Sequence, residues 1–139
     1  MSETGSEAGM TLLELLVVMG LLALIATIAV PQIERELGLM QLRETAGALK
    51  ANLRVIRSDA LRSDQAVAFT LSSDGSGYAW SEGETRSVPG QIALRMSKGQ
   101  KILFYGDGTT SGGAVVATSG GRSISIYVDD ATGAVATGR

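Results

Sequence analysis

A single carboxylate interrupts an apolar stretch that is long enough to cross a membrane. Glu14 lies near the start of this stretch, and residues 15–30 carry no charged side chain. An ionisable group inside such a segment costs about 2.5–3.5 kcal/mol on insertion scales, so its presence indicates a function. Glu14 is therefore the first candidate for a functional residue in this chain.

The acidic residues nearer the C-terminus are weaker candidates. Asp107 lies in the glycine-rich segment 106–113, but no Lys-Ser/Thr pair follows and no helix begins there, which excludes a phosphate-binding loop. Calcium would need several converging oxygens, and Asp107 with the neighbouring hydroxyls offers few. We therefore expect a plain β-hairpin loop. Asp129 and Asp130 are adjacent and would point to opposite faces of a strand, so we expect a turn rather than an acid–base pair.

Composition excludes several other kinds of site. The sequence has no Cys and no His, which excludes disulfides, thiol chemistry, the usual zinc ligand sets and every His-based triad. The net charge of −2 comes from 12 bases and 14 acids and suggests no particular partner. We expect no catalytic residue, no metal site and no cofactor, and hence a protein that is not an enzyme.

The apolar segment, residues 10–30, would span about 31 Å as a helix, which matches a hydrocarbon core of about 30 Å. We expect a transmembrane helix. A cleaved signal peptide is the weaker alternative, because Glu3 and Glu7 stand where Lys or Arg would be expected. A buried helix of a soluble protein is disfavoured, because no other helix of the chain could cover it. No Lys or Arg precedes the segment and Arg35 and Arg43 follow it, so composition leaves the topology open.

Pro31 lies where the apolar run meets polar sequence, and it either ends the helix or kinks it. An apolar stripe at mostly helical spacing continues to about Ser63, so we expect an amphipathic continuation over residues 31–64 with a kink at Pro31. The members of this stripe are Ile33, Leu37, Met40, Leu42, Ala46, Leu49, Leu53, Ile56 and Ala60. Four bases lie in an arc beside the stripe, namely Arg43, Lys50, Arg54 and Arg57. They form either a solvated flank or a contact face for a partner helix, acidic lipid or nucleic acid.

After Asp64 the hydrophobic period changes to two, which is typical of strands. The segments of this kind are residues 67–71, 78–80, 92–96, 101–105, 114–118, 123–128 and 134–136. They predict one small antiparallel sheet of about six or seven strands over residues 65–139. Neither this sheet nor the amphipathic helix is stable alone, so we expect an α+β fold in which the two pack together.

Gly9, Met10, Glu14 and Pro31 together resemble the class III signal of type IV pilin-like proteins. In that family a membrane-embedded prepilin peptidase cuts after the glycine and methylates the new N-terminal amine. The resemblance implies a leader of residues 1–9, cleavage between Gly9 and Met10, methylation of Met10 and an assembly role for Glu14. This leader departs from the family pattern because it has no Lys or Arg, and Met10 replaces the commoner Phe.

The C-terminal region is similar to the GspH/FimT type of minor pseudopilins and pilins. Residues 102–113 combine aromatic residues with an Asp-Gly-Thr loop and further glycines, and Thr132-Gly133 precedes the last strand. The resemblance implies the pilin fold, in which a long N-terminal helix, transmembrane in its first half and amphipathic in its second, packs on a small antiparallel β-sheet domain.

By the same resemblance the chain would be a minor pseudopilin of a type II secretion system, a structural subunit at or near the tip of the periplasmic pseudopilus. It would cross the inner membrane once, with its C-terminal domain in the periplasm. The implied partners are other major and minor pseudopilins, the prepilin peptidase, the inner-membrane secretion platform and membrane lipid. Glu14 would pair with the methylated amine of its own chain or of a neighbour.

The alternative is a FimT-like minor pilin of a type IV pilus with a role in DNA uptake. DNA binding needs a basic patch, whereas the bases beyond Asp64 are scattered. We therefore do not expect a nucleic acid partner.

Overall fold

The computed structural model describes residues 11–80 and 84–138. The chain divides into two compact units, Met1–Glu36 and Leu37–Arg139. The predicted cleavage and methylation residues, Gly9 and Met10, lie outside the described residues. Among the described residues, the first unit contains the N-terminal part of one helix, and the second contains the rest of that helix and all the described strands.

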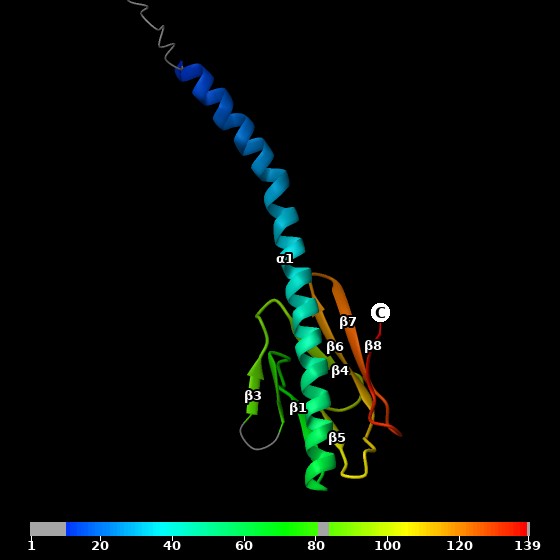
Figure 1. Cartoon of the computed structure of the whole chain (residues 1–139). Coiled ribbons are helices and arrows are strands. Elements are labelled where there is room, and N and C mark those ends of the chain that lie inside the picture. The colour runs from blue at the N-terminus through cyan, green and yellow to red at the C-terminus, as the bar shows by residue number, and fades with distance from the viewer. Residues whose placement is uncertain (1–10, 81–83, 139) are drawn as a thin grey trace, which may run out of the picture. The chain divides into compact units, whose positions relative to one another are not determined.

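Helix α1 runs from Leu12 to Ser63 and continues through Pro31, as the apolar stripe predicted (Figure 1). Pro31 has no N–H to donate to the carbonyl of Thr27 four residues earlier. The kink at Pro31 stays a prediction. At the other end, the Ser63 hydroxyl donates to the Asp59 carbonyl at 2.8 Å, and Asp64 adopts a left-handed conformation with φ of 53°. A left-handed residue directly after the last helical turn ends a helix.

The buried face of α1 begins at Leu42. Its buried members are Leu42, Ala46, Leu49, Leu53, Ile56 and Ala60, all of which belong to the predicted stripe. The first three residues of that stripe are exposed instead. The exposed fraction is 60% for Ile33, which belongs to the first unit, and 52% and 64% for Leu37 and Met40, which belong to the second. The stripe is therefore continuous in sequence, but within its unit only the part from Leu42 onward is buried against the strands.

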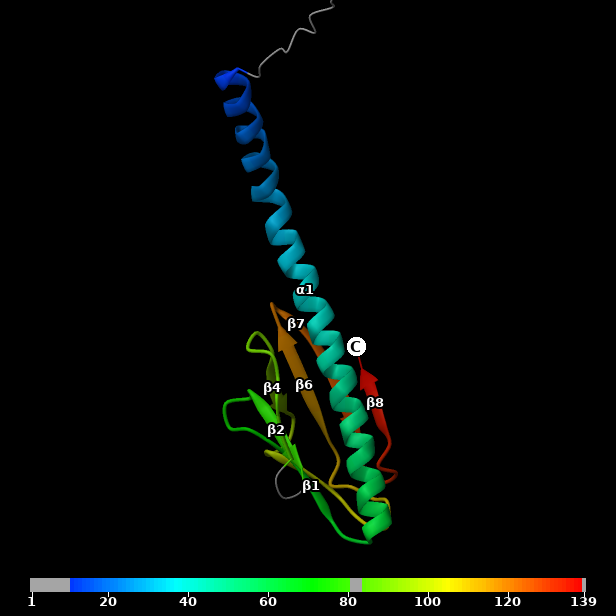
Figure 2. The same ribbon diagram turned by 60° about the vertical axis from the view of Figure 1, so that its left-hand side comes forward.

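Eight described strands form two antiparallel four-stranded sheets, with orders β3-β2-β1-β5 and β4-β6-β7-β8 (Figures 1 and 2). The strands are β1 Val67–Leu71, β2 Gly77–Trp80, β3 Glu84–Ser87, β4 Ala93–Met96, β5 Lys101–Phe104, β6 Gly113–Ser119, β7 Arg122–Val128 and β8 Val135–Gly138. The α+β class with a long helix and antiparallel strands is confirmed. The prediction of one sheet with six or seven strands is wrong. Strand β3 was missed because its sequence, Glu-Thr-Arg-Ser, has no apolar alternation.

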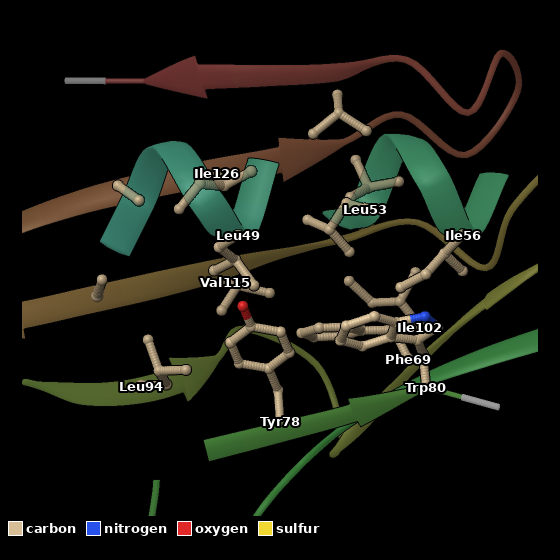
Figure 3. Close-up of a cluster of buried hydrophobic side chains, with 14 of the residues drawn as sticks. Leu49, Leu53, Ile56, Phe69, Tyr78, Trp80, Leu94, Ile102, Val115 and Ile126 are labelled. Carbon is tan, nitrogen blue, oxygen red and sulfur yellow. The ribbon is translucent and has the colours of Figure 1, made fainter. Parts of the chain in front are cut away.

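The two sheets and α1 share one hydrophobic core (Figure 3). Leu49, Leu53 and Ile56 of α1 meet side chains of both sheets, and the other labelled core residues in Figure 3 are Phe69, Tyr78, Trp80, Leu94, Ile102, Val115 and Ile126. The hydroxyl of the buried Tyr78 side chain has a partner, because it accepts a hydrogen bond of 2.7 Å from the Asn52 side-chain amide. Burial of these side chains is the main stabilising contribution to the second unit.

The segment after Phe104 is more than the expected hairpin loop. It does turn back on itself, since Phe104 and Thr110 form an antiparallel bridge. It then enters β6, which belongs to the other sheet, so the segment connects the two sheets. Gly112 lies in this connection and has a left-handed backbone conformation, with φ of 65°. A Cβ at this position would lie 2.9 Å from the Cβ of Asp130. A side chain at this position would be both strained and crowded.

Candidate functional site

The N-terminal part of α1 presents an apolar surface with a single acidic residue. Within the described chain, α1 is the one helix that is long and apolar enough to cross a membrane, and none of the side chains in its most apolar stretch is buried. The Thr27 hydroxyl donates to the Leu24 carbonyl at 2.6 Å. That bond satisfies the polar group within the helix, as an apolar surrounding requires.

Glu14 lies in the first turn of α1, next to a residue that sequence reasoning overlooked. The backbone N–H of Glu14 donates to the Thr11 hydroxyl at 3.2 Å, and that of Leu15 donates to the Thr11 carbonyl at 3.1 Å. Thr11 is therefore the N-cap, and Thr11 with Glu14 has the Thr-x-x-Glu spacing of a capping box. A carboxylate in the first turn also interacts favourably with the helix dipole. Glu14 thus has a local role in helix initiation besides the predicted role in charge pairing.

The predicted site residues do not form one compact centre. Glu14 and Pro31 lie on the same helix, about 26 Å apart at 1.5 Å per residue. The basic residues Arg43, Lys50, Arg54 and Arg57 lie on the second unit's part of α1. Arg43 and Arg54 are exposed, whereas Lys50 and Arg57 are half-buried.

The acidic candidates beyond Asp64 are turn residues. The Asp129 carboxylate accepts bonds from the Thr132 hydroxyl at 2.7 Å and the Thr132 N–H at 2.8 Å, and Asp107 is bonded in the same way to Thr109. The expectation of a turn at Asp129-Asp130 is confirmed. No group of three or more acidic residues that could hold a metal ion occurs in the ranges the structure describes.

The hydrogen bonds between Asp129 and Thr132 should make the stability of the folded chain depend on pH in acid. The hydroxyl and N–H of Thr132 hold the pKa of Asp129 below its ordinary value. Because this pKa is lower in the folded chain than in the unfolded chain, the stabilisation is present at neutral pH and disappears as the pH falls below about 4. We expect Asp129→Asn to lower the urea midpoint at neutral pH and to lose less stability on acidification than the wild type. Asp130→Asn is the control, and equal behaviour of the two variants would contradict the assignment.

Comparison with known proteins connects this architecture to one fold. No protein-family model and no curated protein matches the sequence. Three solved structures are similar in three dimensions. The minor type IV pilin FimU of Pseudomonas aeruginosa, in two crystal forms, has a TM-score of 0.60 and 15% identity over 70% of this chain and 88% or 93% of that one. The minor pseudopilin EpsH of the type 2 secretion system of Vibrio cholerae has a TM-score of 0.59 and 9% identity over 70% of this chain and 95% of that one. The resemblance to type IV pilin-like proteins is therefore confirmed at the level of the fold, and this chain has the pilin fold.

Proposed function

We propose that this chain is a minor pseudopilin of a type II secretion system, a structural subunit of the periplasmic pseudopilus at or near its tip. In this proposal residues 10–30 anchor the chain in the inner membrane, and residues 65–139 form a periplasmic domain. The prepilin peptidase cuts after Gly9 and methylates Met10. The partners are other pseudopilins, the secretion platform and membrane lipid.

The observation that carries the proposal is the exposed apolar helix with Glu14 in its first turn, joined to a domain of the pilin fold. A water-soluble protein would not leave so long an apolar surface uncovered. Leu37 and Met40, on the part of α1 that belongs to the second unit, are also exposed. Apolar surface therefore extends beyond the membrane-length segment, as a helix that enters a bundle with other helices requires.

Glu14 gives this bundle a means of selecting its members. Inside a group of apolar helices the dielectric constant is low, so an unpaired carboxylate is strongly disfavoured and an opposite charge is strongly attracted. The methylated amine of Met10 keeps its positive charge and supplies that partner, from the same chain or from a neighbour. A subunit is then stable in the bundle only where the carboxylate and an amine come together.

The proposal makes a direct prediction about the mature N-terminus. When the chain is produced together with a prepilin peptidase, intact-mass analysis of the membrane fraction should give a protein that begins at Met10 and carries one additional methyl group. Gly9→Val should block this processing, because by resemblance the enzyme requires glycine before the cut. Ala8→Val is the matched control and should be processed normally. Thr27-Ile28-Ala29 has the small-x-small pattern of a signal peptidase site. A mature chain that begins directly after it, at Val30, would instead identify a signal peptide and would contradict the proposal.

A FimT-like minor pilin of a type IV pilus with a role in DNA uptake is the second candidate. It is supported by the likeness to the minor type IV pilin FimU, whose TM-score equals that of EpsH within 0.01. Retention of duplex DNA by the full chain in detergent at physiological salt favours this candidate, because such binding depends on phosphate contacts. Absence of retention, together with restored secretion in a strain that lacks its GspH-type subunit, favours the pseudopilin.

A further inference from the structure

A groove lies between the second half of α1 and the beginning of β8. It is lined by Arg54, Arg57, Ser58 and Leu61 of the helix and by Gly133, Ala134 and Val135 of the strand and its preceding turn, with a volume of about 490 Å³. Every one of these residues belongs to the second unit. The groove therefore lies within one compact body, beside the strand that carries the C-terminus in Figure 2.

The helix side of the groove is positively charged. Two further bases, Lys50 and Arg43, lie on α1 toward its N-terminus from Arg54 and Arg57. We call these four residues the basic flank. Within the described residues none of the four forms an ion pair, since the one ion pair found there joins Arg62 to Asp59. The Nε of Arg57 is moreover buried without a hydrogen-bond partner. The flank thus carries positive charge that no acidic side chain of the described residues pairs with.

The strand side of the groove is an open sheet edge. Strand β8 pairs only with β7 among the described strands, in a register that places Val128 opposite Val135 and Ile126 opposite Thr137. The Asp129 N–H donates to the Ala134 carbonyl at 3.0 Å. Because hydrogen-bonded and non-hydrogen-bonded pairs alternate in an antiparallel ladder, Val135 and Thr137 are non-hydrogen-bonded positions, and their N–H and C=O groups face away from β7.

One extended segment could contact the open edge of β8 and the basic flank at the same time, because the two run alongside each other over a similar length. In Figures 1 and 2, β8 runs antiparallel to α1. A strand added outside β8 would therefore pass along the helix and meet the basic flank. From Arg57 to Arg43 the helix rises about 21 Å, which corresponds to about six residues of extended chain.

We infer that this groove is a docking site for an extended, acidic segment of a partner protein. Its backbone would add to β8 through the N–H and C=O groups of Val135 and Thr137, and its carboxylates would pair with Arg54 and Arg57. Strand addition at a sheet edge supplies affinity through the main chain, and side-chain contacts supply specificity. An unpaired edge also needs a cover of this kind, because it is otherwise a site of non-specific association.

An extended segment fits the observations better than a helix or a nucleic acid. A helix has no free main-chain groups along its length to satisfy the edge of β8. DNA would use the basic flank through its phosphates and would leave Val135 and Thr137 unused. Participation of the β8 edge therefore distinguishes these occupants.

The test uses the full chain in detergent micelles and a fluorescently labelled peptide in which valine and aspartate alternate. Binding is measured by anisotropy, and protection of β8 by hydrogen exchange with mass spectrometry. The paired variant Arg54→Gln/Arg57→Gln should weaken binding by about tenfold or more, as loss of charge-assisted hydrogen bonds predicts. Its matched control is Arg95→Gln/Arg122→Gln, which removes the same charge from exposed positions elsewhere. That control should bind like the wild type.

The backbone part of the inference is tested at Thr137. Thr137→Pro removes an N–H that faces away from β7 and should weaken binding by a similar factor, whereas Thr137→Val keeps that N–H and should bind normally. Emission from Trp80, the one tryptophan of the sequence, verifies that each variant is folded. All variants keep Glu14 and residues 1–30, so the result is separate from the test of the proposed function.

Four outcomes would overturn the inference. They are no binding of the acidic peptide at millimolar concentration, equal binding of a peptide in which asparagine replaces aspartate, equal weakening by both arginine pairs, and unchanged binding to Thr137→Pro. Displacement of the peptide by duplex DNA, with DNA binding insensitive to Thr137→Pro, would identify a nucleic-acid surface instead.

Discussion

Replacement of Leu53 by alanine should lower the free energy of unfolding of the second unit by about 2–5 kcal/mol. Leu53 is fully buried at the centre of the contact between α1 and the sheets (Figure 3). The change removes apolar contacts and leaves a cavity between α1 and the sheets. Because the strands are held in place by pairing within their own sheets, they cannot move far enough to fill this cavity completely. A small domain is stable by about 5–15 kcal/mol in total, so this loss is a large fraction of its stability.

Urea unfolding followed by the emission of Trp80 measures this effect on the second unit alone. Trp80 lies in the same core and is the one tryptophan of the sequence, so the apolar segment does not contribute to the signal. Val55→Ala is the control on the same helix, since Val55 is 49% exposed and its replacement should change stability little. Equal midpoints for Leu53→Ala and the wild type would show that α1 does not pack on the sheets as described.

The elements that could be predicted from sequence are those with a local signal. The stripe from Leu42 to Ala60 has a helical period, so its burial follows from the sequence alone. The pairing of β1 with β5, and of β4 with β6, joins segments that are distant in sequence. Nothing in the local pattern indicates that these pairs belong to two sheets rather than one. The exposure of Met40 has the same origin, because periodicity identifies an apolar face and not what covers it.

The candidate site was predictable to a similar degree. Glu14 stood out because charge is rare in apolar segments, and the turn at Asp129 followed from residue type. Thr11 could have been recognised from its spacing to Glu14, since Thr-x-x-Glu before an apolar run is a capping signal. The groove beside β8 could not, because Arg57 and Val135 are brought together by the packing of α1 against a strand that forms near the end of the chain.

The largest functional effect is expected from Glu14→Gln. Glutamine has nearly the same shape and is also favoured at this position of a capping box, so the helix should still begin at Leu12. The change removes only the charge. If Glu14 pairs with a methylated amine in the helix bundle, the amine is then left buried and unpaired, which costs about 3–5 kcal/mol and corresponds to more than about a hundredfold loss of affinity for the bundle. The variant should be processed and inserted normally but should be nearly absent from sheared pseudopili, and secretion should fall accordingly.

Two matched variants separate charge pairing from helix initiation. Thr11→Ala removes the hydroxyl that accepts the Glu14 N–H but keeps the carboxylate, so it should cost about 0.5–2 kcal/mol of helix stability and leave assembly largely intact. Glu14→Asp keeps the charge on a shorter side chain and should retain more assembly than Glu14→Gln. Assembly is quantified as the ratio of subunit in the sheared fraction to subunit in the membrane. If Thr11→Ala impaired assembly as much as Glu14→Gln does, the role of Glu14 in assembly would be to stabilise the first turn of the helix and not to pair with a charge. Wild-type secretion by Glu14→Gln would refute the pairing role altogether, because the carboxylate would then be replaceable by a neutral group of the same size.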